Sequence, residues 1–140
     1  MSKKRWFGIA LLFGVLYTAV GVITGEIAGA AATTQMRNLW RWSAFVISGM
    51  LFAAHIAHEH VRLRSTTRTA AWHTAIGVAL GGFGLALAAN IHELAAATSY
   101  RPKMVIALIA WPLITAVPAY IAALAIAAGL GAMRTRGQPL

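Results

Sequence analysis

Four apolar stretches, each long enough to cross a lipid bilayer, make up most of this chain, and the ionisable residues lie near their ends. The stretches run from about residue 6 to 32, 42 to 61, 69 to 97 and 104 to 132 of a chain of 140 residues. A membrane helix needs roughly 20 residues to cross the ~30 Å hydrocarbon layer. The sequence therefore predicts an all-α polytopic membrane protein, with residues 1–140 forming a single four-transmembrane-helix bundle with short loops.

The composition excludes several classes of protein. Hydrophobic residues make up 59% of the chain and charged residues 11%, whereas about 25% of a soluble domain is charged. The absence of cysteine excludes disulfides and thiolate metal sites. There is no aspartate and no serine in a recognisable nucleophile context, so an enzyme of the hydrolytic kind has little support.

The net charge of +9 comes from Lys and Arg in the segments between the apolar stretches, which favours contact with lipid headgroups over nucleic acid. With four antiparallel helices, eight of these residues lie on one side of the membrane: Lys3, Lys4, Arg5, Arg62, Arg64, Arg68, Arg134 and Arg136. The other side has four: Arg37, Arg41, Arg101 and Lys103. The positive-inside rule then places both termini in the cytoplasm of a cell with an inner membrane, most simply a bacterium, although an eight-to-four margin leaves dual topology open.

The first stretch has a second interpretation. A basic start, an apolar region and the small residues 28–32 follow the order of a cleaved signal peptide. The apolar region exceeds the usual length of about 7–15 residues, which favours a retained helix.

Glycines recur on one face of the first and third stretches. They are Gly21, Gly25 and Gly29, and Gly77, Gly81 and Gly84. Small residues at this spacing let membrane helices approach closely and gain van der Waals contact. The spacing does not decide whether these faces meet within one chain, in a homo-oligomer or in a larger membrane complex.

The densest group of candidate ligands lies near the end of the second stretch, in the segment from His55 to His60. At 100° per residue, His55, His58 and Glu59 fall within roughly a 100° arc, while His60 points away from it. The connection to the third stretch is short, so an antiparallel hairpin brings His73 to about the same depth. The pattern predicts a four-group site of His55, His58, Glu59 and His73.

Imidazole and carboxylate ligands suit a divalent transition metal, and two axial imidazoles from facing helices suit haem b. Neither spacing is diagnostic, because it does not match the HExxH zinc motif. The simpler alternative is that these side chains lie solvated among the headgroups, paired with Arg62 or Arg64. A proton relay is the third interpretation.

A second polar layer is expected near the outer surface. It comprises Glu26, Asn90, His92 and Glu93. Interfacial charges cost little, which favours ion pairs with nearby arginines over a buried binding site.

The sequence leaves three functions open. The first is a scaffold or accessory membrane subunit with a His/Glu site at its cytoplasmic end. The second is a redox subunit that binds haem b through His55 or His58 and His73. The third is a small proton- or cation-coupled transporter that uses Glu26 and Glu93 at the outer face.

Overall fold

The predicted all-α four-helix bundle is confirmed. The structure is a computed structural model that describes residues 3–96 and 103–136, with side chains for residues 5–96 and 103–130. The helices are α1 (Lys3–Ala30), α2 (Thr34–Val61), α3 (Thr67–Ala95) and α4 (Lys103–Arg136). All four are long and apolar enough to cross a membrane.

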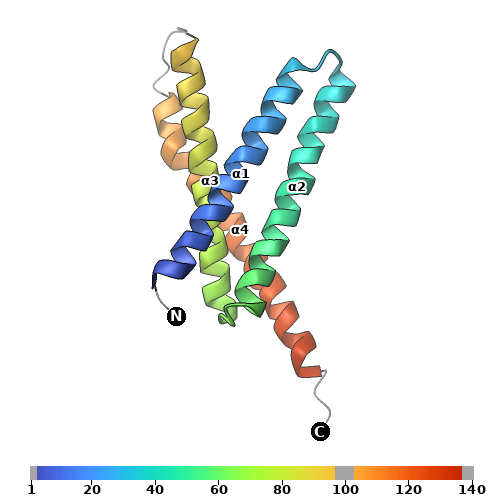
Figure 1. The fold of residues 1–140 in the computed structure, drawn as a ribbon, viewed down its shortest axis with the longest axis vertical. Helices are drawn as coiled ribbons and strands as arrows, with labels where there is room; N and C mark the ends of the chain where they lie inside the picture. Colours follow the sequence, from blue (N-terminus) through green and yellow to red (C-terminus); the bar gives the residue numbers. More distant parts are fainter. Residues whose placement is uncertain (1–2, 97–102, 137–140) are drawn as a thin grey trace.

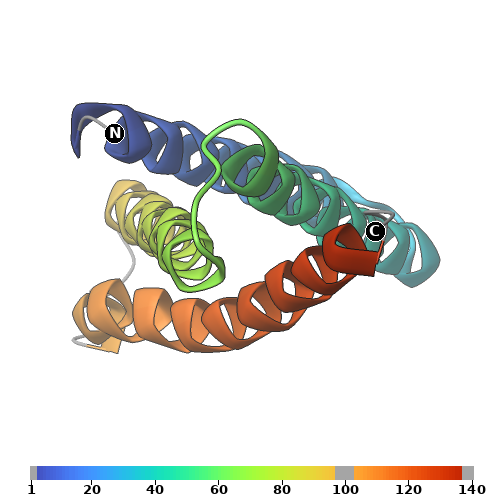
Figure 2. The same cartoon turned by 90° about the horizontal axis from the view of Figure 1, so that it is seen from below.

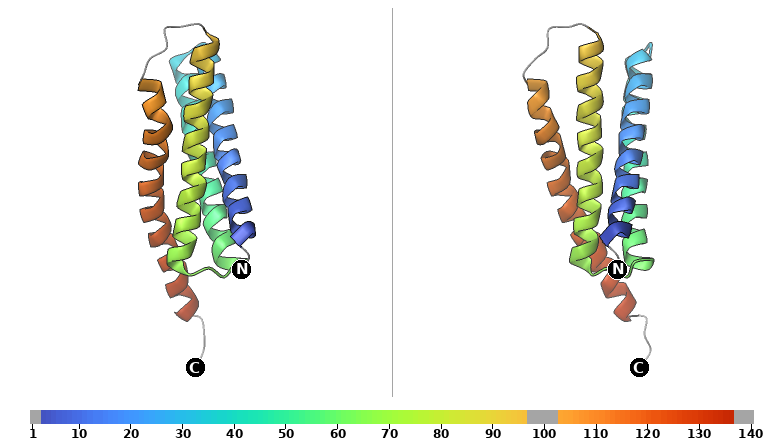
Figure 3. Two further views of the ribbon diagram at one scale, coloured as in Figure 1. Left: turned by 90° about the vertical axis from the view of Figure 1, so that its left-hand side faces the viewer. Right: turned by 60° about the vertical axis from the view of Figure 1, so that its left-hand side comes forward.

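Successive helices run in opposite directions, so α1 begins and α4 ends at the same end of the molecule (Figure 1). We call this the terminal end and the opposite one the far end. The helix α3 packs extensively on both α1 and α4, whereas α2 packs mainly on α1. Figures 1 and 3 show the α1–α2 and α3–α4 pairs diverging toward the far end.

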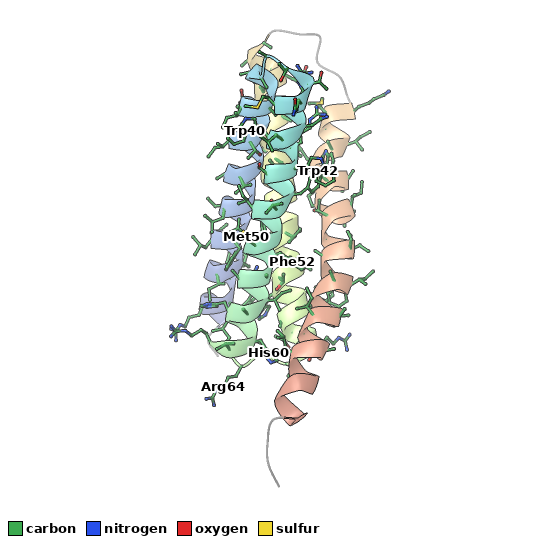
Figure 4. The ribbon with its side chains drawn as sticks, turned by 90° about the vertical axis from the view of Figure 1, so that its right-hand side faces the viewer. Trp40, Trp42, Met50, Phe52, His60 and Arg64 are labelled. Atoms are coloured by element: carbon green, nitrogen blue, oxygen red, sulfur yellow. The ribbon has the colours of Figure 1, made fainter. Side chains whose placement is uncertain are left out.

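A small apolar cluster joins α2, α3 and α4 near the terminal end. Its buried members are Ile56, Ala71, Ala123 and Ala127. Farther along, Trp42 and Phe52 lie on the side of α2 that faces α4 (Figure 4). Many large apolar side chains point outward, including Phe45, which is 72% exposed, and such a surface matches lipid rather than water.

The helix α2 begins much earlier than predicted, at Thr34 rather than near residue 42. Thr33 caps it, because its side-chain oxygen accepts a hydrogen bond from the Met36 amide at 3.2 Å. Gln35 and Arg37 interrupt the apolar pattern without disfavouring a helix. The other boundaries lie within about four residues of those predicted, and Ala97 lies outside the described residues.

The α3 glycines and Gly21 pack against side chains of neighbouring helices of the same chain, not against one another, and Gly21 lies against Leu85. A Cβ atom at Gly81 would lie 2.6 Å from Cβ of Tyr17, and one at Gly84 would overlap Thr18, so both let α3 approach α1. Gly77 likewise leaves space for the ring of His55, which belongs to α2. In contrast, a Cβ at Gly25 or Gly29 would meet no atom within 4 Å. The Gly25 and Gly29 part of the predicted face is therefore not used in packing among the described residues.

Two prolines lie inside α4, which stays helical through both and curves around α3 (Figure 2). Pro112 and Pro118 each remove a backbone donor, and this is the usual cause of such bending. At the bend, a Cβ at Gly82 would lie 2.7 Å from Oγ1 of Thr115, so this glycine permits the close contact of α3 with α4.

Asn90 ties α3 to α4 toward the far end. Its Nδ2 donates to the carbonyl oxygens of Ala86 at 2.7 Å and Met104 at 2.9 Å. We expect Asn90→Ala to lower the free energy of unfolding in detergent by about 1 kcal/mol, since one hydrogen bond between helices is lost. Asn38→Ala, at an exposed position, is the control and should change thermal unfolding little. Equal effects of the two variants would contradict this role.

Candidate functional site

A buried acid–base pair joins α2 and α3 near the terminal end. Nδ1 of His73 lies 3.0 Å from Oε2 of Glu59. The hydroxyl of Ser65 donates to the same carboxylate oxygen at 2.9 Å. Glu59 is completely buried and His73 is 9% exposed. The hairpin between the two helices thus closes around one carboxylate.

The loop between α2 and α3 holds Ser65 in place. Its amide donates to the carbonyl oxygen of Glu59 at 3.1 Å, and Arg64 just before it adopts a left-handed conformation with φ of 49°. Thr66 then caps α3 by accepting a hydrogen bond from the Thr69 amide at 3.3 Å. These local bonds set the position of the Ser65 hydroxyl relative to Glu59.

Two aromatic rings of α1 cover the histidines. Trp6 stacks on His73 with ring centroids 4.4 Å apart, and Phe13 stacks on the completely buried His55 at 4.1 Å. Both ring pairs are within 4° of parallel. The helix α1 therefore covers His55 and His73, which together with Glu59 we call the His/Glu cluster.

Among the residues whose side chains the structure describes, several buried polar atoms near this pair find no hydrogen-bond partner. They are Oε1 of Glu59, both ring nitrogens of His55 and Oγ1 of Thr74. Leaving such a group buried without a partner costs about 1–3 kcal/mol. Polar groups retained at this cost inside membrane helices commonly mark ion or proton pathways.

The predicted ligand set is only partly assembled. Glu59 and His73 meet as expected, but His55 stacks on Phe13, and His58 lines a separate groove with Arg5 and Arg62. Among the described residues, no three histidine or glutamate side chains are arranged to hold one metal ion. In this arrangement Glu59 and His73 lie together, and His55 and His58 lie apart from them.

The packing of His55 also disfavours a haem ligand. One face of the ring lies on Phe13, and its Cε1 fills the space beside Gly77. Both ring nitrogens of His55 are also buried, so a haem iron could reach them only if the surrounding helices moved apart.

The expected outer polar layer is divided between two places. Glu26, His92 and Glu93 line one cavity of about 660 Å³ at the far end. Asn90 does not line this cavity and is used to join α3 to α4. Glu26 and His92 are exposed, while Glu93 is half-buried.

The middle of the bundle lies between the far-end cavity and the Glu59–His73 pair. The far-end cavity shares Gly21 and Leu85 with a crevice of about 520 Å³ that reaches Tyr17. The Tyr17 hydroxyl is buried without a partner, and its ring centroid lies 6.5 Å from that of Phe13. Phe13 in turn stacks on His55. Aromatic side chains thus separate the crevice from the His/Glu cluster.

The chain was compared with family models, curated proteins and solved structures. No match was found. Its own geometry is therefore the basis for assigning a function.

The Glu59–His73 pair can bind and release one proton without moving far. When Glu59 is ionised, Nδ1 of His73 donates to Oε2, and when Glu59 is protonated its hydroxyl can donate to Nδ1. Ser65 can donate to the carboxyl in either state. This is the chemistry of a general acid–base pair.

Three residues of the site were not predicted from the sequence. Ser65 lies in the loop, where helical periodicity carries no information. Trp6 has the position of an ordinary interfacial tryptophan, and Phe13 is one of many apolar residues in its stretch. The hydroxyl-rich segment 65–67 beside Glu59 is the sequence feature that could have indicated a hydroxyl partner for this carboxylate.

Proposed function

We propose that this protein is a small proton-coupled carrier of the inner membrane, with Glu59 and His73 as its proton-binding pair. The observation that carries the proposal is the completely buried, hydrogen-bonded carboxylate of Glu59 within a helix that can span a membrane. Both termini are assigned to the cytoplasm from the distribution of Lys and Arg.

The contrast among the three glutamates supports this assignment. Glu26 is exposed and Glu93 half-buried, both at the far-end cavity, whereas Glu59 is completely enclosed. Burial of a carboxylate is costly unless it is paired or protonated. Retaining one here favours a role that needs a proton to be bound and released.

Cavities lead from the far end of the bundle toward the pair. The far-end cavity and the crevice lead from Glu26 and Glu93 as far as Tyr17. At the terminal end, a separate groove is lined by His58, the residue that directly precedes Glu59 in the sequence. In the proposed cycle, the barrier formed by Phe13 and Tyr17 yields when Glu59 changes its protonation state. The transported partner is a cation or small solute that enters from the far-end cavity.

Reconstitution into liposomes tests the proposal. A pH-sensitive dye inside the vesicles reports an imposed pH gradient. When sodium, potassium or a small organic cation is supplied on the side of the membrane with the lower proton concentration, the gradient should collapse faster than in protein-free vesicles. Collapse at the rate of protein-free vesicles under every cation gradient would overturn the carrier and favour a scaffold or accessory subunit.

A further inference from the structure

A second polar site lies at the terminal end, between α1 and α2. This groove has a volume of about 640 Å³ and is lined by Arg5, Gly8, Ile9, His58, Arg62 and Leu63. Arg5 and Arg62 are exposed, and His58 is half-buried. Two helices therefore contribute positive or protonatable groups to one depression.

The cations of the groove receive no carboxylate from the three glutamates of the chain. Glu59 directs Oε2 to Ser65 and His73, which do not line the groove. Glu26 and Glu93 line the far-end cavity. An anion from outside the chain is the natural complement to the two guanidinium groups.

The lining residues other than Arg5, His58 and Arg62, which we call the floor of the groove, are apolar and leave room. A Cβ at Gly8 would meet no atom within 4 Å, and Ile9 and Leu63 complete the lining. A free anion would need only Arg5, His58 and Arg62, which we call the rim of the groove. An amphipathic molecule with a phosphate head and a hydrocarbon body would use both the rim and the floor.

We propose that this groove binds one anionic phospholipid. Its phosphate lies between Arg5, Arg62 and His58, and the start of an acyl chain lies along Gly8 and Ile9. Arg5 is near the start of α1 and Arg62 directly follows α2, so both are at the depth of the headgroups if these helices span the membrane. This inference does not depend on proton transport.

Titration of the 140-residue chain in detergent tests the site, with bound lipid counted by native mass spectrometry. Phosphatidylglycerol should bind at least tenfold more tightly than phosphatidylcholine. Arg5→Gln and Arg62→Gln should each weaken phosphatidylglycerol binding about fivefold, since one basic group near a membrane surface contributes about that factor. Gly8→Leu should weaken it at least as much by filling the floor, with the charges unchanged.

Arg64→Gln and Arg68→Gln are the matched controls. Both residues are exposed at the same end but do not line the groove, and Figure 4 shows Arg64 pointing away from the helices. Binding equal to wild type is expected for both. Equal losses in all four arginine variants would overturn the site in favour of general surface charge. Normal binding by Gly8→Leu, with displacement of lipid by millimolar inorganic phosphate, would overturn it in favour of a free-phosphate site.

Discussion

Replacing Glu59 by glutamine is expected to reduce proton flux in proteoliposomes by about a hundredfold or more, the usual scale for loss of a positioned acid–base group. Glutamine has nearly the same shape, and its amide can still hydrogen-bond to Ser65 and His73. It cannot take up or release a proton at neutral pH. The variant therefore removes proton exchange with little change in packing. Flux should be compared at equal protein content, after circular dichroism has verified the helices.

Glu26→Gln is the matched control for this variant. Glu26 is exposed at the far-end cavity, so its replacement should lower the flux far less than that of Glu59. His73→Gln should behave like Glu59→Gln, because it removes the other member of the pair. Flux that fell in Glu26→Gln but stayed normal in Glu59→Gln would assign proton binding to the far end instead.

Gly81→Ala is expected to destabilise the bundle by about 1–3 kcal/mol, the range seen when an extra methyl group is forced into a packed interior. Its new Cβ would lie 2.6 Å from Cβ of Tyr17, and neither atom can move without shifting a helix. The free energy of unfolding, measured with denaturant in mixed micelles, should fall accordingly.

Gly25→Ala on α1 makes the same chemical change at a position where a Cβ meets nothing within 4 Å. It should leave stability unchanged or slightly higher, since alanine favours helix more than glycine does. A destabilisation as large as that of Gly81→Ala would indicate that Gly25 packs against another molecule, such as a second copy of the chain.

The number of helices and the all-α class followed from the sequence, because hydropathy alone requires four long apolar segments. The meeting of Glu59 with His73 also followed, since a short antiparallel hairpin brings the end of one helix beside the start of the next. The sequence could not predict that His55 and His58 lie apart from Glu59 and His73. Periodicity gives the angle of a residue around its own helix, but it does not say which neighbour that angle faces.

The stacking of Trp6 on His73 depends on where α1 lies against α3. That placement depends on which glycines pack against side chains of the other helix. Gly81 packs against Tyr17, whereas a Cβ at Gly25 would meet no described atom within 4 Å. Gly81 and Gly25 both belong to small-xxx-small patterns, so the spacing alone could not tell which of them packs against another helix. The first turns of α2 were missed for a different reason, because the polar residues around Arg37 lower hydropathy without breaking a helix.

Infrared difference spectroscopy of the lipid-reconstituted protein tests the central claim most directly. The chain has three glutamates and no aspartate, so its side-chain carboxyl bands are few enough to assign by substitution. As pH is varied, one carboxyl band should change together with an imidazole band, and both changes should be absent from Glu59→Gln. Wild-type and Glu59→Gln spectra that respond identically to pH would show that Glu59 exchanges no proton and would contradict the account.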